Sequence, residues 1–439
     1  MLTHFITTNA VTISTILLLV VYIFIALEKI PKATIALIGA GITILLGLVS
    51  QDKTLHDALN PYYFINYIDF NVIFLLVSMM IIVLITTKSG VFNWVANELL
   101  KHTKGHPISI LFVLGLFTAV VSSFLDNVTT VILIMPITFA IAKKLDINAI
   151  PFLITEIFAS NIGGTATLIG DPPNIIIGCA GNLSFMDFIK ELTPVVAIIL
   201  VCILSLMAFI FRKELVATPE QMKAISNIDN SNTITDKNLM QRSLFILGLV
   251  ILGFVTHDIT HLSTSLIAFL GASVLLVFEK PSEIFKEIEW NTIFFFIGLF
   301  IIIGGLEASG GIKLMAEWII KITQGSQVAT SMIILWASGI ISGIIDNIPY
   351  TATMTPMLVE IQKTMGADYT YPLWWALSLG ACLGGNMTII GAAANVIVSE
   401  NARKEGYYIF FLNFLKYGIF VVLISLIIST IYVYLRFLI

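Results

Sequence analysis

Apolar segments long enough to cross a lipid bilayer recur along the whole of this 439-residue chain. Runs of about 20 apolar residues are typical of membrane-spanning helices, and the first of them cover about residues 11–27, 33–49 and 70–86. Only 11% of the residues are charged and the mean hydropathy is +0.98, whereas soluble proteins carry about 25% charged residues. The sequence therefore predicts an all-α polytopic membrane protein.

The chain also repeats itself at a nearly constant offset. Asn71, Ser89, Gly90, Asp126, Asn127 and Pro136 recur 220 positions later, Gly163, Gly164, Thr167, Gly170 and Asn174 recur at 221, and Gly39-Ala40 recurs at 232. An ordered series of this kind indicates an internal duplication. We expect repeat 1 at residues 11–211 and repeat 2 at 242–436, joined by a polar linker at 212–241.

The orientation of the repeats follows from the number of crossings. If each Asp-Asn break, at 126–127 and 346–347, is a re-entrant hairpin, each repeat crosses five times and the two copies are inverted. This arrangement places 16 of the 23 Lys and Arg residues on one side and six on the other. Because cytoplasmic loops are enriched in basic residues, the linker is predicted to be cytoplasmic and both termini outside, in the plasma membrane.

Three acids interrupt the apolar stretch from Ser122 to Asn174: Asp126, Glu156 and Asp171. A charge at bilayer depth is costly and usually marks a transport path or proton relay. Irregular backbone at that depth is tolerated where it lines a cavity. The three acids are therefore candidates for cation or proton coupling, although Asp126 and Asp171 are also typical helix-capping residues.

Inverted repeats with one broken helix each are typical of secondary transporters, whose site lies between the repeats at the membrane midplane. The predicted binding residues are oxygen-bearing side chains and glycines around the two breaks, a set that suits Na⁺ or protons better than soft metals. No metal site or further cofactor is expected. In repeat 1 they are Asp126, Asn127, Thr129, Thr130, Ser160, Asn161, Gly163, Gly164, Thr165, Thr167, Asp171 and Asn174. In repeat 2 they are Asp346, Asn347, Thr351, Gly384, Gly385, Asn386, Thr388 and Asn395.

The two copies differ in their acids. Asp171 is matched by Ala392, and Glu156 is matched by Leu377. Coupling is therefore predicted to lie in repeat 1, with Asp126 and Asp171 left as alternatives. Whether Lys416 or Cys382 lines the site is also open at this point.

The run Ser160–Asn174 (SNIGGTATLIGDPPN), with Asp126-Asn127 before it, resembles the ArsB/NhaD group of the ion transporter superfamily, in particular the branch that contains the P protein. The resemblance implies scaffold helices, a re-entrant hairpin and an unwound transmembrane helix in each repeat. It also implies a homodimer whose transport domain moves as an elevator. The scaffold would be residues 11–101 and 242–321, and the transport part 105–211 and 325–436.

The predicted function is secondary active transport of a small ion or solute, coupled to protons or Na⁺. Arsenite is neutral at pH 7, and the resemblance makes proton-coupled arsenite or antimonite efflux the first candidate. Na⁺/H⁺ antiport and Na⁺-coupled carboxylate or anion transport are the alternatives, and an ion channel is the rival class. An enzyme is not expected, because no Ser or Cys nucleophile has a histidine within the membrane. The expected partners are lipid and a second copy of the chain, with no nucleic acid.

Overall fold

The computed structural model describes residues 6, 8–27, 29–49, 61–226, 230 and 232–439, and every regular element among them is helical. The predicted all-α membrane fold is confirmed. The first half contains α2 (Ala10–Ala26), α3 (Lys32–Leu45), α5 (Pro61–Ile65), α6 (Phe70–Lys88), α7 (Val91–His102), α8 (Pro107–Ser122), α9 (Asn127–Leu145), α10 (Ile150–Gly164), α11 (Pro172–Gly181), α12 (Phe185–Glu191) and α13 (Thr193–Phe211).

The second half follows a short helix in the linker, α14 (Pro219–Ser226). It contains α15 (Lys237–Val255), α16 (His257–Thr260), α17 (Thr264–Leu276), α18 (Pro281–Glu287), α19 (Trp290–Ala308), α20 (Gly311–Ile322), α21 (Gln327–Ser342), α22 (Asn347–Met365), α23 (Ala367–Gly384), α24 (Ala393–Lys404), α25 (Phe411–Val433) and the π-helix η1 (Tyr434–Leu438).

The helix boundaries reproduce the duplication seen in the sequence. Helices α6, α7 and α9 begin at Phe70, Val91 and Asn127, and α19, α20 and α22 begin 220 positions later. Local signals recur as well: α7 and α20 each follow a left-handed glycine, Gly90 with φ 80° and Gly310 with φ 82°, a conformation that favours glycine. The two halves are therefore built from the same series of helices.

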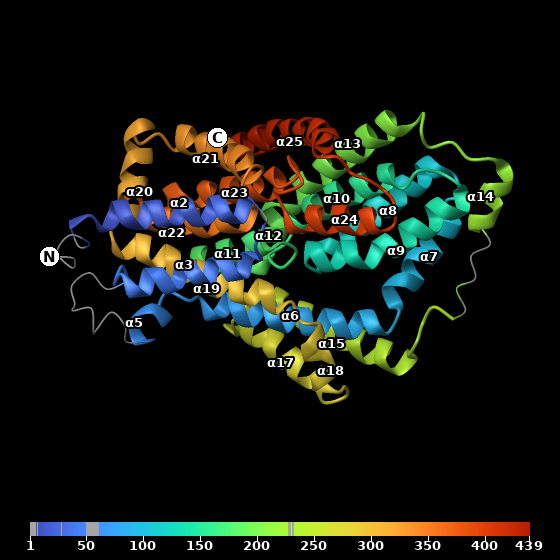
Figure 1. Cartoon of the computed structure of the whole chain (residues 1–439), viewed down its shortest axis with the longest axis horizontal. Helices are drawn as coiled ribbons and strands as arrows, with labels where there is room; N and C mark the ends of the chain where they lie inside the picture. The colour runs from blue at the N-terminus through green and yellow to red at the C-terminus, as the bar shows by residue number, and fades with distance from the viewer. Residues whose placement is uncertain (1–5, 7, 28, 50–60, 227–229, 231) are drawn as a thin grey trace.

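The two copies pack against each other through α3 and α17. Helix α3 of the first half packs on α19 of the second, and α17 of the second packs on α6 of the first. Within each half, the two arms of a hairpin flank the broken helix, as α8 and α9 do on α10, and as α21 and α22 do on α23. Figure 1 places α7 and α20 at opposite ends of the molecule, an arrangement that inverted repeats require.

Six helices in the described part of the chain have at least 18 residues and are apolar enough to cross a membrane: α6, α9, α13, α15, α19 and the continuous α25–η1. Helices α2, α3, α8, α10 and α17 are apolar but shorter. Together they make a multi-pass membrane protein. The sides on which the loops and termini lie stay predictions.

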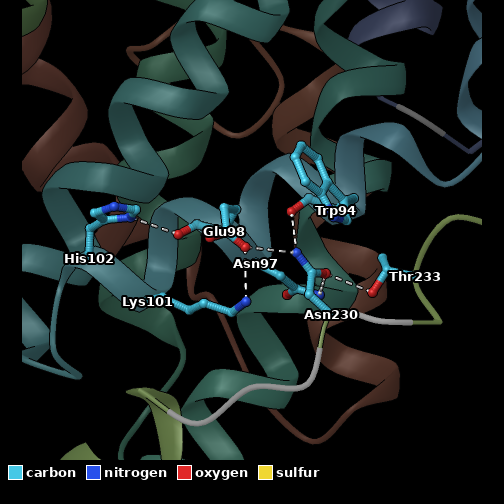
Figure 2. Close-up of polar contacts among 7 residues, drawn as sticks. All are labelled: Trp94, Asn97, Glu98, Lys101, His102, Asn230 and Thr233. Carbon is cyan, nitrogen blue, oxygen red and sulfur yellow. Dashed lines mark hydrogen bonds and ion pairs between the residues drawn. The ribbon is translucent and has the colours of Figure 1, made fainter. Parts of the chain in front are cut away.

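The linker contacts α7 through Asn230. Asn230 donates through Nδ2 to the Trp94 carbonyl oxygen at 2.9 Å and to the Glu98 carboxylate at 3.3 Å. Its Oδ1 accepts from Asn97 at 3.3 Å and from Thr233 at 2.8 Å. Figure 2 shows these contacts, together with the ion pair of Glu98 with Lys101 at 2.9 Å. The linker is thus fixed to the end of the molecule that carries α7.

Candidate functional site

One asparagine holds the first break, the residues 165–171 that separate α10 from α11. Asn174 Nδ2 donates to the carbonyl oxygens of Gly164, Thr165 and Thr167 at 3.4, 3.1 and 2.8 Å. Carbonyl groups at the end of a helix have no partner within it, and a buried carbonyl must find one. Asn174 is fully buried, so its amide stabilises the break from inside the protein.

The second break, residues 385–392 between α23 and α24, is stabilised in the same way, by an asparagine amide that donates to carbonyl oxygens of the break. Asn395 Nδ2 donates to the carbonyl oxygens of Gly385 and Thr388 at 2.8 Å each. The residue before each following helix is extended, with φ −143° and ψ 133° at Asp171 and φ −149° and ψ 148° at Ala392. The duplication has therefore preserved the shape of both breaks.

Two glycines let the hairpins approach the broken helices. A Cβ atom at Gly163 would overlap the backbone of Ala119 in α8, and one at Gly384 would overlap the backbone of Gly339 in α21. The predicted glycines thus act through close backbone packing. Each hairpin and its break form one tightly packed unit as a result.

The aspartates at the two hairpin tips cap the helices that follow them. Asp126 accepts from the backbone N–H of Thr129 at 2.9 Å and from its hydroxyl at 2.6 Å. Asp346 accepts from the backbone N–H of Ile348 at 3.0 Å. These contacts are typical of N-caps, and they position the asparagine that follows each aspartate.

Those asparagines, Asn127 and Asn347, meet at Asp171. Asn127 Nδ2 lies 3.2 Å from Asp171 Oδ1, and Asn347 Nδ2 lies 3.2 Å from Asp171 Oδ2. Asp171 is fully buried. One carboxylate therefore accepts hydrogen bonds from both hairpin tips, one tip from each repeat.

A second asparagine junction joins the two breaks. Asn161 accepts from Asn127 at 3.2 Å and donates to the side-chain oxygens of Asn386 and Asn395, each at 2.9 Å. Asn161, Asn386 and Asn395 are fully buried. The structure thus brings together the residues predicted from both copies in one continuous buried network.

The network is rich in negative charge. Asp126 and Asp346 are close enough to Asp171 for their charges to act on it. Among the described residues, the ion pairs include Asp346 but neither Asp126 nor Asp171. A buried carboxylate without a basic partner is costly to ionise. Charge at this site therefore favours binding of a cation.

Three buried polar atoms of the described site residues have no hydrogen-bond partner: Thr130 Oγ1, Thr351 Oγ1 and Asn386 Nδ2. Thr130 lies three residues after Asn127, and Thr351 lies four residues after Asn347. Residues at these spacings share a helix face. Buried polar groups are normally satisfied, so these atoms mark where a bound ion or solute would find partners.

Several predicted ligands instead donate to backbone carbonyl oxygens of the hairpins or of α10. The Thr167 hydroxyl donates to the Ser123 carbonyl oxygen, and the Thr388 hydroxyl donates to that of Gly343 at 2.6 Å. The Ser160 hydroxyl donates to the Asn127 carbonyl oxygen at 3.2 Å, and the Thr165 hydroxyl to that of Asn161 at 2.8 Å. These bonds to backbone atoms give the four hydroxyls a structural role.

Glu156 lies apart from the network. Its side chain, in α10, is 2% exposed and accepts from the Thr138 hydroxyl at 2.5 Å. The two residues whose role was open also differ. Cys382 Sγ lies 3.4 Å from Asn174 Oδ1 and so borders the first break, whereas Lys416 is exposed on α25.

Comparison with known proteins identifies the family. The family model described as citrate transporter matches residues 22–380. The chain belongs to the citrate transporter family. It is 41% identical to a 46 kDa membrane protein of Mycobacterium leprae over 96% of this chain and 97% of that protein. It is also 41% identical to an uncharacterized transporter of Mycobacterium tuberculosis, over 95% and 96% of the two chains.

The predicted relationship to the P protein is also found. The P protein of Sus scrofa is 30% identical over 96% of this chain, which spans 59% of the P protein. The YdaH transporter of Alcanivorax borkumensis shares the fold, with a TM-score of 0.58 and 14% identity over 93% of this chain and 99% of that one. The chain is therefore a membrane transporter rather than an enzyme. The narrower ArsB/NhaD assignment stays a prediction.

Sequence reasoning missed two contacts of this transporter. Lys32, which was counted among the loop residues, lies with its Nζ 2.6 Å from Asp346 Oδ2. Ser378, in α23, donates to Asn174 Oδ1 at 2.6 Å. Both contacts join segments that are far apart in the chain. The position of Lys32 at the first residue of an apolar helix was the one available signal for the first of them.

Proposed function

We propose that the protein is a secondary active transporter in which Asp171 binds the coupling cation, a proton or Na⁺. The observation that carries the proposal is the fully buried Asp171 carboxylate, which accepts from Asn127 and Asn347 and forms no ion pair among the described residues. Such a group is stable when a proton or cation neutralises it. Because its two donors lie on different hairpin tips, occupancy of Asp171 would affect how both tips pack.

We propose alternating access of the elevator type for the movement. Close packing at Gly163 and Gly384 supports it, because each hairpin and its broken helix would then move as one body. The moving part would comprise residues 105–211 and 325–436, against a scaffold of 11–101 and 242–321. The same proposal includes a homodimer whose two copies meet through the scaffold. It also places the linker, residues 212–241, in the cytoplasm.

The solute would be small and rich in oxygen. The unpartnered Thr130 and Thr351 hydroxyls and the Asn386 amide offer hydrogen bonds to such a molecule. Arsenite, which has three hydroxyl groups, is the first solute to test, for efflux driven by protons. The description of the family favours a carboxylate such as citrate as the second. Na⁺/H⁺ antiport needs only the carboxylates and is the third.

The test uses purified protein in liposomes with an imposed pH or Na⁺ gradient. We expect one of these gradients to drive arsenite, citrate or Na⁺ uphill, and Asp171→Asn to abolish this movement while the protein stays folded. Asp146→Asn, which changes an exposed carboxyl at the end of α9, serves as the matched control and is expected to transport normally.

Two results would contradict the proposal. Solute flux that only follows its own gradient, whatever the pH or Na⁺ gradient, would indicate a channel. Uphill transport that persists in Asp171→Asn would remove Asp171 from the coupling role and move attention to Asp126 or Glu156.

A further inference from the structure

The second hairpin tip, residues 343–346, and the α22 helix that follows it contact helices α3 and α2. Lys32 Nζ, at the start of α3, lies 2.6 Å from Asp346 Oδ2, and the Asp346 side chain is 2% exposed. Beside it, the Tyr22 hydroxyl of α2 donates to the Pro349 carbonyl oxygen at 2.6 Å and contacts the Thr353 hydroxyl. Helices α2 and α3 belong to the proposed scaffold, so these contacts cross from the scaffold to the moving part.

The first hairpin tip, residues 123–126, lacks an equivalent attachment among the described residues. Asp126 accepts from Thr129 of its own helix. Helix α17 corresponds to α3 at an offset of 232, which places Thr264 where repeat 1 has Lys32. The duplication therefore left a basic residue at this scaffold position in repeat 1 alone.

The second hairpin tip is also linked to Asp171, through the residue that follows Asp346. Asp346 pairs with Lys32, and the next residue, Asn347, donates to Asp171 Oδ2 at 3.2 Å. The backbone N–H of Asn347 donates in turn to the Gly391 carbonyl oxygen of the second break at 3.1 Å. A displacement of Asp346 toward or away from the scaffold would therefore move the Asn347 amide that donates to Asp171.

Separation of this pair leaves a buried charge that must be compensated. Removing one partner of a buried ion pair leaves the other charge without its partner, which is strongly unfavourable. If the tip moves relative to the scaffold, Asp346 loses the ammonium group. A proton or a hard monovalent cation can take its place, since carboxylate oxygens bind both.

We propose that Lys32 is a tethered internal cation that competes with a second bound cation, a proton or Na⁺ in addition to the one at Asp171, for Asp346. In this conformation the ammonium group occupies Asp346 and holds the second tip on the scaffold. When the second cation binds Asp346, it displaces Lys32 and frees the tip to move. Lys32 thereby sets the cation concentration at which the transporter responds. The inference rests on the proposed cation-coupled function and adds a residue to it.

Cation binding to the purified full-length protein tests this role directly. The melting temperature is followed against NaCl, with choline chloride keeping the ionic strength constant, and in a second series against pH. Two cations that compete for one carboxylate are coupled in their binding, typically by about 5- to 150-fold in affinity. Lys32→Gln is therefore expected to lower the half-effective NaCl concentration by about tenfold.

Three further variants serve as controls. Lys29→Gln removes an exposed lysine three residues away and should titrate as the wild type does. Lys32→Arg keeps the charge and should also titrate normally. In an Asp346→Asn background, Lys32→Gln should no longer shift the midpoint, because the two cations then have no shared carboxylate. If Lys32→Gln does not fold, Lys32→Asp combined with Asp346→Lys restores the pair and should recover the melting temperature but not the cation response.

The proposal is wrong if Lys32→Gln and Lys29→Gln share the same midpoint in both titrations, or if the exchanged pair melts no higher than Lys32→Asp alone. These measurements concern binding and stability. A failure of the proposed function would instead be seen in liposomes, as absent uphill transport or as transport that persists in Asp171→Asn.

Discussion

The two breaks share a backbone and differ in their chemistry. Each is closed by an asparagine amide on buried carbonyl groups, Asn174 in the first break and Asn395 in the second, and each ends in an extended residue. That extended residue is Asp171 in one break and Ala392 in the other. The shape of a break therefore does not depend on the carboxylate, and the carboxylate is available for another role.

The hairpin tips differ in a complementary way. Asp346 is paired with Lys32 of α3, whereas Asp126 accepts from Thr129 of its own helix. Repeat 1 thus supplies the central acid, Asp171, and also the basic residue that contacts the tip of repeat 2. The two copies therefore share one backbone design, whereas these two additional charged residues lie in repeat 1.

The largest effect is expected when Asp171 of the first break is replaced by alanine, the residue at the corresponding position of the second break. Asp171→Ala should keep the fold, because Ala392 occupies the same backbone conformation without a side-chain cap. Uphill transport should disappear, since the shared acceptor of both tips is gone. Melting temperature and liposome transport, measured on the same preparation, distinguish a loss of transport from a loss of folding. A variant that unfolds would show that Asp171 is mainly structural.

The next largest effect concerns the close packing at the breaks. Gly163→Ala and Gly384→Ala should each destabilise the protein by about 3 kcal/mol, because the added methyl group meets backbone that cannot move aside. Gly41→Ala is the matched control, since nothing lies within 4 Å of a Cβ atom there. Denaturant or thermal melts of the three variants give the comparison. Equal stability of Gly163→Ala and Gly41→Ala would mean that the hairpin is loosely packed.

How much of the fold and of the site the sequence predicts depends on how far apart along the chain the interacting residues lie. The breaks and the helix starts at Asp126 and Asp346 were predictable, because glycine, proline and capping residues act within a few positions along the chain. The duplication predicted which residues of the two copies would meet. The Lys32–Asp346 pair was not predictable, because it joins residues 314 positions apart, and the position of Lys32 at the start of an apolar helix does not identify its partner.

Hydroxyl residues show a second limit of the sequence. Thr130, Thr167 and Thr388 all looked like ligands, because their position near a break was the only information. Thr167 and Thr388 donate to backbone carbonyl oxygens across the hairpin, and of the three only Thr130 has an unpartnered hydroxyl. A threonine hydroxyl can act as a ligand or as a structural donor to backbone. The sequence does not distinguish these roles, because the direction of the side chain decides between them.

A smaller and unequal effect is expected at the two asparagines. Asn174→Ala leaves buried carbonyl groups unsatisfied and also removes the acceptor of Ser378, at a cost of about 1–3 kcal/mol for unsatisfied groups. Asn395→Ala likewise removes an acceptor, that of Asn161, but should cost less, because Asn395 donates to two carbonyl oxygens instead of three. Asn413→Ala, at an exposed position of α25, is the control. Equal losses at both sites would mean that the third carbonyl contact contributes nothing.

The smallest effect is expected far from both breaks, where the linker meets α7. The ion pair with Lys101 is the main cause that holds the pKa of Glu98 below its usual range, and the hydrogen bond from Asn230 adds to it. A carboxyl group with a lowered pKa stabilises the folded state above its unfolded pKa, and this contribution is lost as pH falls through the folded pKa.

Linker docking should therefore be unchanged from neutral pH down to about pH 4.5, near the usual carboxyl range, and weaken below it. Glu98→Gln should reproduce the weaker docking at neutral pH, by a small amount because the pair is partly exposed and screened by salt. Hydrogen exchange of residues 232–240 measures the docking, with the exposed Glu220→Gln as control. Since this contact lies in neither break, transport by Glu98→Gln should equal that of the wild type; a loss would show that the linker takes part in transport.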